Sequence, residues 1–435
     1  MKYVIIGGSA AGISGAETIR SIDKKGEITV ISDENFPLYS RCLITYYLAQ
    51  TINEKEIKFK PDDFFKRNNI KSLLGVKAEK IMHNEKKIAL NNGSFLTYDK
   101  LLIATGGCPK KLGIKGEDKN GVFGIRTIDD IKSMDNFLNK VNTAVVLGGG
   151  LIGMRTAYAL RARGKKVIVI VKSNMILSQM LDDRAADIFK KLFERNGTEI
   201  MLGLAGNEVL GDKNVKGLKL DNGREIDCEL VIIGKGVNSN IDITKGTDIK
   251  TGWGIVVDDY MQTTITDIYA AGDVVQTKDI TTEEDTINAL WPCAVEQGRI
   301  AGLNMAGERE SYDGSLSMNS LVFYDIPVIS FGIIKPKKEG YEQIVKENKV
   351  RNVYKKMVIK DNRLVGAVLV NDVNQSGVYN VLIRRKIDVS SIKEVLLDDN
   401  FNFAKILHLI KSNEDKFKEK EYKEKILTYS YEQDL

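Results

Sequence analysis

Two glycine-rich stretches of similar sequence constrain the fold of this chain more than any other feature. They are VIIGGSAAG at residues 4–12 and VVLGGGLIG at residues 145–153. In each, an apolar run ends in glycines and then passes into a helical pattern, which predicts a strand, a tight turn and a helix. A glycine turn at a helix start lets the backbone and its unpaired N–H groups approach a pyrophosphate. Two such turns therefore indicate a protein that binds two dinucleotides.

The composition is that of a globular protein of two or three domains. The chain has 435 residues, 43% of them hydrophobic and 28% charged, and its formal net charge of +5 gives no support to nucleic-acid binding. No apolar run reaches the length of a membrane span, and Met1 leads into the first predicted strand without a signal peptide, so we expect a cytoplasmic protein. No metal site is predicted, because no metal-ligand spacing connects the four cysteines, Cys42, Cys108, Cys228 and Cys293.

The first glycine turn lies between elements that the pattern predicts as a strand at 2–6, a helix from Ala10 or Ala11 towards Arg20, and a strand at 27–32. Gly7, Ser9 and Gly12 occupy the three positions of the dinucleotide fingerprint, so a serine replaces the middle glycine. Asp33 and Glu34 follow the second strand, where an acidic residue accepts hydrogen bonds from the ribose hydroxyls. The alternative is that Asp33 and Glu34 only begin a polar loop.

The second turn keeps all three fingerprint glycines, Gly148, Gly150 and Gly153. The elements predicted around it are a strand from Ala144, a helix through Leu160, a strand at 166–171 and a closing segment at 234–239. The strand at 166–171 is followed by Lys172, and no carboxylate is present there to bind a ribose diol. Lys172 would pair with the 2′-phosphate of NADPH, which favours that donor slightly; the alternative is a solvated loop lysine.

Later motifs give the chain a specific resemblance. They are FPLYSRCLITYYLA at 36–49, YDKLLIATGG at 98–107, IYAAGDVV at 268–275 and WPCAVEQGRIAGLNMAG at 291–307. Over roughly residues 1–400 the chain resembles the FAD-dependent pyridine nucleotide oxidoreductases. The branch it resembles most holds rubredoxin and ferredoxin reductases, nitrite reductase flavin domains, NADH oxidases and coenzyme A-disulfide reductases. The resemblance implies FAD and NADH or NADPH as cofactors, with hydride exchange between them.

The resemblance implies an α/β fold with two Rossmann-like dinucleotide-binding domains and a C-terminal α+β interface domain. The FAD domain is expected at residues 1–108 and 240–315, and the NAD(P) domain at 109–239. Residues 316–410, with alternating strand patterns and a helix, would form the interface domain, through which a homodimer or a larger complex would assemble. The charged tail at 411–435 is interpreted as a solvated terminal helix; the alternative is an element that docks a partner.

The resemblance also assigns site residues, position by position. Asp273 would bind the ribityl or pyrophosphate region of FAD, and Arg126 would lie near the flavin unless it only begins a helix. The cofactor-binding positions are Gly7, Ser9, Ala10, Gly12, Asp33, Glu34, Arg41, Cys42, Ala78, Ala104, Thr105, Gly106, Arg126, Gly148, Gly150, Leu151, Ile152, Gly153, Lys172, Gly236, Gly272, Asp273 and Trp291.

The electron acceptor depends on the segment around Cys42, which is a hybrid of two patterns. Cys42 lies in register with the redox cysteine of the thiol-reactive and oxidase members. Tyr39 and Arg41 instead fit the rubredoxin and ferredoxin reductases, in which a proline stands in place of Cys42. A redox role needs a thiolate, whose pKa Arg41 or a helix start would lower. The alternative is that Cys42 is a small packed residue beside the flavin.

Two functions follow from that segment. In the first, the protein exchanges electrons with a small iron–sulfur protein or subunit of the ferredoxin or rubredoxin type. In the second, it is a thiol–disulfide or persulfide reductase, or an NADH oxidase, that uses Cys42. We favour the first, because Arg41 and the segment LWPCAVEQGR at 290–299 resemble that branch more closely. Ala10 replaces the histidine that peroxidase members carry in the first glycine turn.

One departure from the family involves a pair of positions. Many members carry a Glu on the first turn of the nicotinamide-domain helix and a Lys near the redox segment, and the two form an ion pair beside the flavin. This chain has Arg155 and Tyr46 there. Losing one partner alone would leave an unpaired charge in a partly desolvated site, so we expect a joint replacement. Arg155 and Tyr46 are predicted to lie together near the flavin, with Arg155 supplying positive charge; the alternative is an Arg155 that extends into solvent.

Overall fold

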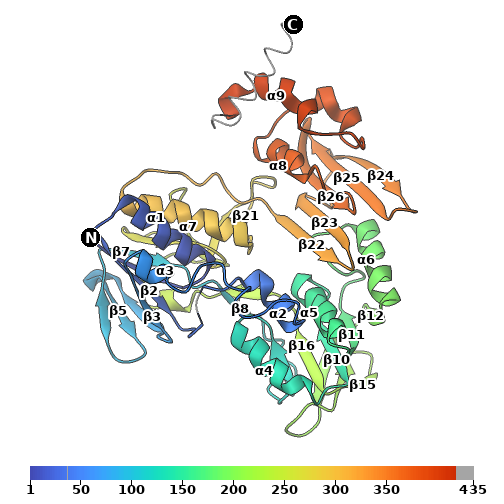
Figure 1. Ribbon diagram of the computed structural model, residues 1–435, viewed down its shortest axis with the longest axis horizontal. Helices are drawn as coiled ribbons and strands as arrows, with labels where there is room; N and C mark the ends of the chain where they lie inside the picture. Colours follow the sequence, from blue (N-terminus) through green and yellow to red (C-terminus); the bar gives the residue numbers. More distant parts are fainter. Residues whose placement is uncertain (37, 418–435) are drawn as a thin grey trace. The chain divides into compact units, whose positions relative to one another are not determined.

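The computed structural model of the protein describes residues 1–36 and 38–417 (Figure 1). Internal contacts divide the chain into two compact units. The dinucleotide unit holds residues 1–177, 190–279 and 284–315, and the C-terminal unit holds 178–189, 280–283 and the chain from Leu316. Residues 178–189 and 280–283 thus pack with the C-terminal unit, although the sequence placed them in the dinucleotide-binding domains.

The first glycine turn belongs to a parallel five-stranded sheet of order β19-β7-β1-β2-β3. Its strands are β1 (Lys2–Ile6), β2 (Glu27–Ser32), β3 (Ile70–Leu74), β7 (Lys100–Ile103) and β19 (Ile268–Ala270), and α1 (Ala10–Ile22) follows β1. The predicted strands at 2–6 and 27–32 are confirmed at both ends. Ile5 and Val30 are fully buried, as continuous apolar strands of a covered parallel sheet should be.

A second parallel sheet of the same kind, order β12-β11-β10-β16-β9, carries the second glycine turn. Its strands are β9 (Val122–Gly124), β10 (Thr143–Leu147), β11 (Lys166–Val171), β12 (Thr198–Leu202) and β16 (Leu230–Ile233), and α5 (Leu151–Ala162) follows β10. The predicted strand at 166–171 is confirmed, and α5 continues two residues past the predicted Leu160. Both Rossmann-like folds are therefore present.

Small antiparallel or mixed sheets and further helices complete the dinucleotide unit. They are α2 (Ile44–Leu48), α3 (Phe64–Arg67), β4 (Ala78–Met82), β5 (Lys87–Leu90), β6 (Phe95–Thr97), β8 (Gly107–Pro109), α4 (Ile128–Leu138), β13 (Gly206–Leu210), β14 (Gly217–Leu220), β15 (Glu225–Asp227), β17 (Val237–Ser239), β18 (Ile255–Val256), β20 (Val275–Lys278), β21 (Asp285–Thr286) and α7 (Trp291–Ala306). Helix α7 lies directly against α1, because a Cβ on Gly298 would lie 2.2 Å from the Ala11 carbonyl oxygen (Figure 1). This contact places the middle of α7 beside the start of α1, directly after the first glycine turn.

The C-terminal unit is built on an antiparallel sheet of order β22-β23-β26-β25-β24. Its elements are β22 (Met318–Phe323), β23 (Ile326–Gly332), β24 (Glu342–Asn348), β25 (Val353–Lys360), β26 (Arg363–Val370), α8 (Ser376–Arg384) and α9 (Leu407–Lys411). The predicted hairpin turn is confirmed: Asp361 and Asn362 adopt positive φ angles of 49° and 58° between β25 and β26. Residues 418–435, most of the predicted charged terminal helix, lie outside the described residues.

A buried ion pair joins the short segment 178–189 to the sheet of the C-terminal unit. Lys356 Nζ lies 3.0 Å from Asp182 Oδ2, and the Tyr354 hydroxyl donates to the same oxygen at 2.6 Å. The other Asp182 oxygen accepts from the Ala185 backbone N–H at the start of α6 (Asp183–Arg195). These contacts explain why the first half of α6 packs with the C-terminal unit. No helix within residues 1–36 and 38–417 has the length and apolar character needed to cross a membrane.

Candidate cofactor and electron-transfer site

The two glycine turns have the same backbone geometry. Gly7 has a φ of 124°, and a Cβ added there would lie 2.1 Å from the Ala104 carbonyl oxygen. Gly148 has a φ of 127°, and its Cβ would lie 2.3 Å from the Gly234 carbonyl oxygen. Both positions combine a left-handed conformation with a close backbone approach, so only glycine fits. Each turn is therefore packed against the end of a neighbouring strand of its own sheet, β7 for the first turn and β16 for the second.

The third fingerprint position is equally restricted in both turns. A Cβ on Gly12 would lie 1.9 Å from the Gly7 carbonyl oxygen, and a Cβ on Gly153 would lie 2.0 Å from that of Gly148. These glycines let the first helical turn pack against the strand that precedes it. The predicted strand–turn–helix motifs are therefore confirmed twice in the same geometric form.

The middle fingerprint position, in contrast, tolerates a side chain. No heavy atom lies within 4 Å of a Cβ built on Gly150, whose φ of −77° suits any residue. Ser9 occupies the equivalent place in the first turn with a φ of −110°. Neither residue caps its helix through a side chain, so the N–H groups at the starts of α1 and α5 are free of side-chain caps. The cradles that remain fit the pyrophosphates of two dinucleotides.

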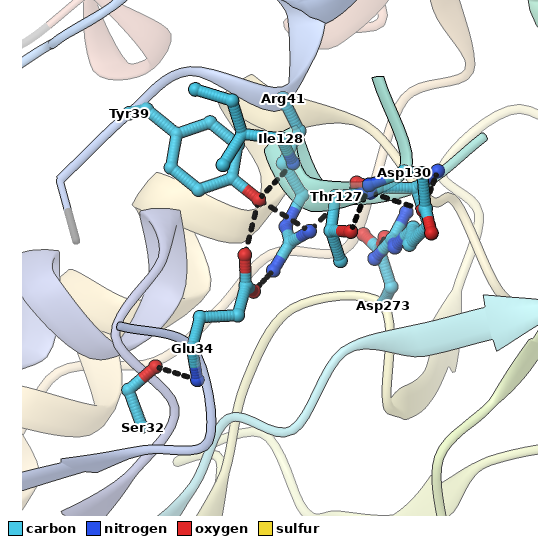
Figure 2. Close-up of polar contacts among 9 residues, drawn as sticks. Ser32, Glu34, Tyr39, Arg41, Thr127, Ile128, Asp130 and Asp273 are labelled. Atoms are coloured by element: carbon cyan, nitrogen blue, oxygen red, sulfur yellow. Dashed lines mark hydrogen bonds and ion pairs between the residues drawn. The ribbon is translucent and has the colours of Figure 1, made fainter. Parts of the chain in front are cut away.

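Glu34 is part of a polar network beyond the end of β2, drawn in Figure 2. Its carboxylate forms an ion pair with Arg41 and accepts a hydrogen bond from the Tyr39 hydroxyl. Burial raises the pKa of Tyr39, so its hydroxyl remains protonated and donates to Glu34. The Tyr39 oxygen in turn accepts from the Ile128 backbone N–H at 3.2 Å. Asp33, the other predicted ribose ligand, is exposed.

The same network connects several predicted flavin residues. Arg41 Nη1 donates to the Arg126 carbonyl oxygen at 2.7 Å, and Arg126 Nη2 forms an ion pair with Asp273 Oδ2 at 2.9 Å. Arg126 precedes the capping box of Thr127 and Asp130 at the start of α4, which Figure 2 also shows. Arg126 is thus more than a helix-start residue: it joins the segment around Arg41 to the AGD motif.

The remaining predicted flavin positions lie around the same end of the first sheet. Thr105 Oγ1 donates to the Asn240 carbonyl oxygen at 2.8 Å, which connects the ATG motif to the returning chain. The backbone N–H of Gly272 donates to Gln297 Oε1 of α7 at 2.8 Å. Trp291 begins α7 and packs edge-on against Phe59, with 5.1 Å between ring centroids. The others are Ala10 at the start of α1, Ala78 at the start of β4, and Ala104 and Gly106 directly after β7.

The second sheet brings together the predicted NAD(P) residues. Leu151 and Ile152 begin α5, and Lys172 follows the last residue of β11. The Gly236 carbonyl oxygen accepts a hydrogen bond from the Lys110 backbone N–H at 3.0 Å, which holds the loop after β16. All these residues lie at the carboxyl end of the sheet, where dinucleotides bind in Rossmann-like folds.

Cys42 is exposed to solvent, yet enough protein surrounds the thiol to desolvate it in part. This desolvation raises the pKa of Cys42, although Ser40, Arg155 and Arg126 act in the opposite direction. Arg41, which we expected to stabilise a thiolate, pairs with Glu34, and Arg155 and Arg126 are the arginines whose charges act on the thiol. A thiol with a raised pKa is a poor nucleophile near neutral pH.

Arg155 and Tyr46 lie in direct contact, as predicted. The guanidinium carbon of Arg155 lies 4.3 Å from the centroid of the Tyr46 ring, a cation–π geometry. Arg155 Nε also donates to Thr45 Oγ1 at 3.1 Å. Arg155 is half-buried and does not extend freely into solvent. It connects the first turn of α5 to α2, the short helix that follows Cys42.

Comparison with known proteins identifies the family. Residues 1–298 match the family model described as pyridine nucleotide-disulphide oxidoreductase. The chain belongs to this family. Residues 318–387 match a second model, described as the rubredoxin NAD+ reductase C-terminal domain. As a member of the family, the protein is an oxidoreductase that uses FAD together with NADH or NADPH.

Individual relatives cover nearly the whole chain. The chain is 32% identical over 398 residues to the NADH-dependent phenylglyoxylate dehydrogenase subunit epsilon of Aromatoleum evansii, an alignment that covers 90% of this chain and 93% of that protein. It is 30% identical over 374 residues to the NADH-rubredoxin oxidoreductase of Clostridium acetobutylicum, covering 86% and 92%. A solved structure of an NAD-dependent persulfide reductase from A. fulgidus superposes with a TM-score of 0.84 at 25% identity, covering 90% and 78%.

Four residues in these contacts were not among the predicted site residues. Tyr39 lies between Glu34 and Ile128, Thr45 holds Arg155, and Gln297 holds the backbone of the AGD motif. The fourth, Lys235, lies beside the second glycine turn. Only Tyr39 had a sequence signal, its place two residues before Arg41 in a family pattern. Thr45 and Gln297 bond to residues far away in the sequence, and only the fold brings Lys235 to the second glycine turn.

Proposed function

We propose that this protein is an FAD-dependent NAD(P)H oxidoreductase that passes electrons to or from a small iron–sulfur protein or subunit. The match of residues 318–387 to the C-terminal domain of rubredoxin NAD+ reductase carries this proposal. A relative that covers most of the chain is named for rubredoxin, which supports the same class of acceptor. Bound FAD would supply the chemistry that links a two-electron hydride donor to a one-electron carrier.

The residues of the site would bind and orient the two dinucleotides. The glycine turns bring the helix N-termini to the pyrophosphates, and the Arg126–Asp273 pair holds the segment that contacts the flavin chain. The network of Glu34, Tyr39 and Arg41 fixes the loop after β2, at the place of the adenosine ribose. Positioning of the two rings is the main contribution that the protein makes to hydride transfer.

The environment of Cys42 supports an acceptor other than a disulfide. Disulfide reduction through Cys42 needs a thiolate, and desolvation acts against the charged form. A nearby base would help, but His83 lies beside Asp248 and His408 beside Ser391. An iron–sulfur acceptor requires neither a thiolate nor a base, since only electrons pass to it.

The experiment that tests the proposal is anaerobic. The enzyme is reduced with NADH or NADPH and then mixed separately with rubredoxin, ferredoxin, coenzyme A disulfide and oxygen, while the flavin absorbance is followed. We expect reoxidation by an iron–sulfur protein to be at least about tenfold faster than by the disulfide or oxygen, which corresponds to about 1.4 kcal/mol in activation free energy. Faster reoxidation by the disulfide would contradict the proposal.

A Cys42→Ser variant is expected to keep both flavin reduction by NAD(P)H and turnover with the iron–sulfur acceptor, each within about twofold of wild type. Serine preserves the volume and polarity of a residue whose thiol stays protonated. Stopped-flow rates with each acceptor are the measurement. Cys108→Ser, at the other exposed cysteine, is the matched control.

A specific observation also favours a second candidate function, a persulfide or disulfide reductase. Cys42 is exposed and is the residue in register with a redox cysteine, and Arg155 and Arg126 both favour its thiolate. The persulfide reductase of A. fulgidus shares the fold. If this function is correct, Cys42→Ser loses disulfide turnover while flavin reduction is retained. In the wild-type enzyme, no iron–sulfur protein would then reoxidise the flavin as fast as the disulfide does.

We place this activity in the cytoplasm, because exposed unpaired cysteines such as Cys42 and Cys108 suit a reducing compartment. We also propose that the C-terminal unit supports assembly into a homodimer or a larger complex. The unit presents a partly exposed apolar side chain on an edge strand, Val345 of β24. Light scattering of the purified enzyme tests the assembly.

A further inference from the structure

Two lysines follow the strands on either side of the second glycine turn. In the sheet, β10 lies between β11 and β16, so the turn after β10 lies between the carboxyl ends of both neighbours. Lys172 directly follows the last residue of β11, and Lys235 lies two residues after the end of β16. The sequence analysis singled out only Lys172.

Close packing fixes the backbone beside each lysine to the turn. A Cβ on Gly149 would lie 2.8 Å from Val171, the residue before Lys172. On the other side, the carbonyl oxygen of Gly234, the residue before Lys235, approaches the turn at Gly148. The two lysines are thus anchored on opposite sides of the start of α5, a helix of 12 residues.

The positive charge at this position is not neutralised by the protein. Among the described residues neither Lys172 nor Lys235 has an ion-pair partner, and residues 172–177, 203–205 and 234–236 contain no Asp or Glu. Burial lowers the pKa of Lys235, and the charge of Lys172 lowers it further. Both lysines follow strands at the same end of the sheet, one on each side of the turn, and Lys235 is half-buried there.

We propose that Lys172 and Lys235 act together as an anion-binding clamp across the second glycine turn, and that the clamp makes NADPH the preferred hydride donor over NADH. The inference rests on the proposed function, since it concerns the donor that binds at this turn. It would distinguish the chain from the relatives that are named for NADH.

The preference follows from charge. The extra phosphate of NADPH sits on the ribose that the end of the second strand reaches, where Lys172 takes the place of the usual carboxylate. A phosphate between two lysines removes their mutual repulsion and gains charge-assisted hydrogen bonds, whereas an uncharged ribose diol does neither. One hydrogen bond to a charged group is strong enough to favour NADPH over NADH by about tenfold to a hundredfold in Kd.

The test measures binding to the FAD-loaded enzyme by calorimetry, with 2′,5′-ADP and 5′-ADP as probes. Wild type should bind 2′,5′-ADP at least about tenfold more tightly. Lys172→Met and Lys235→Met should each remove most of that preference while changing the Kd of 5′-ADP less than about threefold. Lys166→Met is the matched control, because the exposed Lys166 begins the same strand at its opposite end.

Equal wild-type affinities for the two probes would overturn the inference. So would an equal weakening of both probes by Lys235→Met, since that result would make Lys235 a general pyrophosphate contact. The proposed function fails separately: neither NADH nor NADPH would then reduce the flavin, even if 2′,5′-ADP binds selectively. Rapid reduction by NADH and slow reduction by NADPH would retain the proposed function and reject the clamp.

Discussion

A Gly12→Val variant is expected to purify as a colourless protein, whereas wild type should be yellow and bind one FAD per chain. The Cβ of any residue at position 12 would lie 1.9 Å from the Gly7 carbonyl oxygen, so α1 and the turn must move apart. Overpacking of this kind costs about 1–3 kcal/mol, and the displaced turn no longer presents its N–H groups to the pyrophosphate. The absorbance near the flavin maximum, divided by the protein concentration, gives the FAD content.

Gly153→Val is the reciprocal control, because it creates the same clash 2.0 Å from the Gly148 carbonyl oxygen. It should keep FAD and lose reduction by NAD(P)H. Circular dichroism spectra of both variants show whether they remain folded. If Gly12→Val retains one FAD per chain, or if Gly153→Val loses FAD and still binds the nicotinamide dinucleotide, the assignment of the turns is incorrect.

An Arg155→Glu variant is expected to have a flavin potential lower than that of wild type by about 30–60 mV, which corresponds to about 1.4–2.8 kcal/mol for two electrons. Arg155 is half-buried, contacts the Tyr46 ring and is held by Thr45, so its charge is fixed beside the segment of Cys42. Removing a positive charge disfavours the more negative, reduced flavin. Reduction by NAD(P)H should slow by about tenfold to a hundredfold, with FAD retained.

Redox titration against a reference dye measures the potential, and stopped-flow absorbance measures the rate. Arg163→Met is the control at the C-cap of the same helix, because Arg163 contacts Asp135 and the Leu48 carbonyl oxygen. The Arg163→Met variant should keep the flavin potential within about 10 mV of the wild-type value. This is less than half of the smallest shift expected for Arg155→Glu, about 30 mV. An unchanged potential in Arg155→Glu would show that Arg155 does not act on the flavin.

The parts of the fold that the sequence predicted are those governed by local rules. The strands at 2–6, 27–32 and 166–171 were placed correctly, because short apolar runs that end at turn residues leave little choice. The strand–turn–helix motif was predicted correctly although Ser9 replaces the middle glycine, because the structure shows that this position accepts a side chain. Positive φ angles at Gly7 and Gly148 follow from the same motif.

The residues that the sequence missed owe their roles to partners far along the chain. Thr45 is 110 residues from Arg155, and Gln297 is 25 residues from Gly272. No local pattern marks such a pair. Lys235 was missed for the same reason, because its significance depends on Lys172, which follows a strand two places away in the sheet.

Strand periodicity also failed at one position in the C-terminal unit. Alternation along β25 would leave either Lys355 or Lys356 in solvent, but the structure buries both. Lys355 pairs with Asp372 at 2.5 Å, and Lys356 pairs with Asp182 at 3.0 Å. A sheet covered on both faces can hold charged residues only where each finds a partner. The pair with Asp182 also explains why residues 178–189 belong to this unit.

The difference between Ser9 and Gly150 affects the entropy of the unfolded chain. Both residues adopt backbone angles that any amino acid can reach, but glycine samples many more conformations before the protein folds. Ordering the second turn therefore costs about 0.4–1 kcal/mol more than ordering the first at this position. The turn that we propose for FAD therefore loses less conformational entropy on folding at this position than the turn that we propose for the nicotinamide dinucleotide.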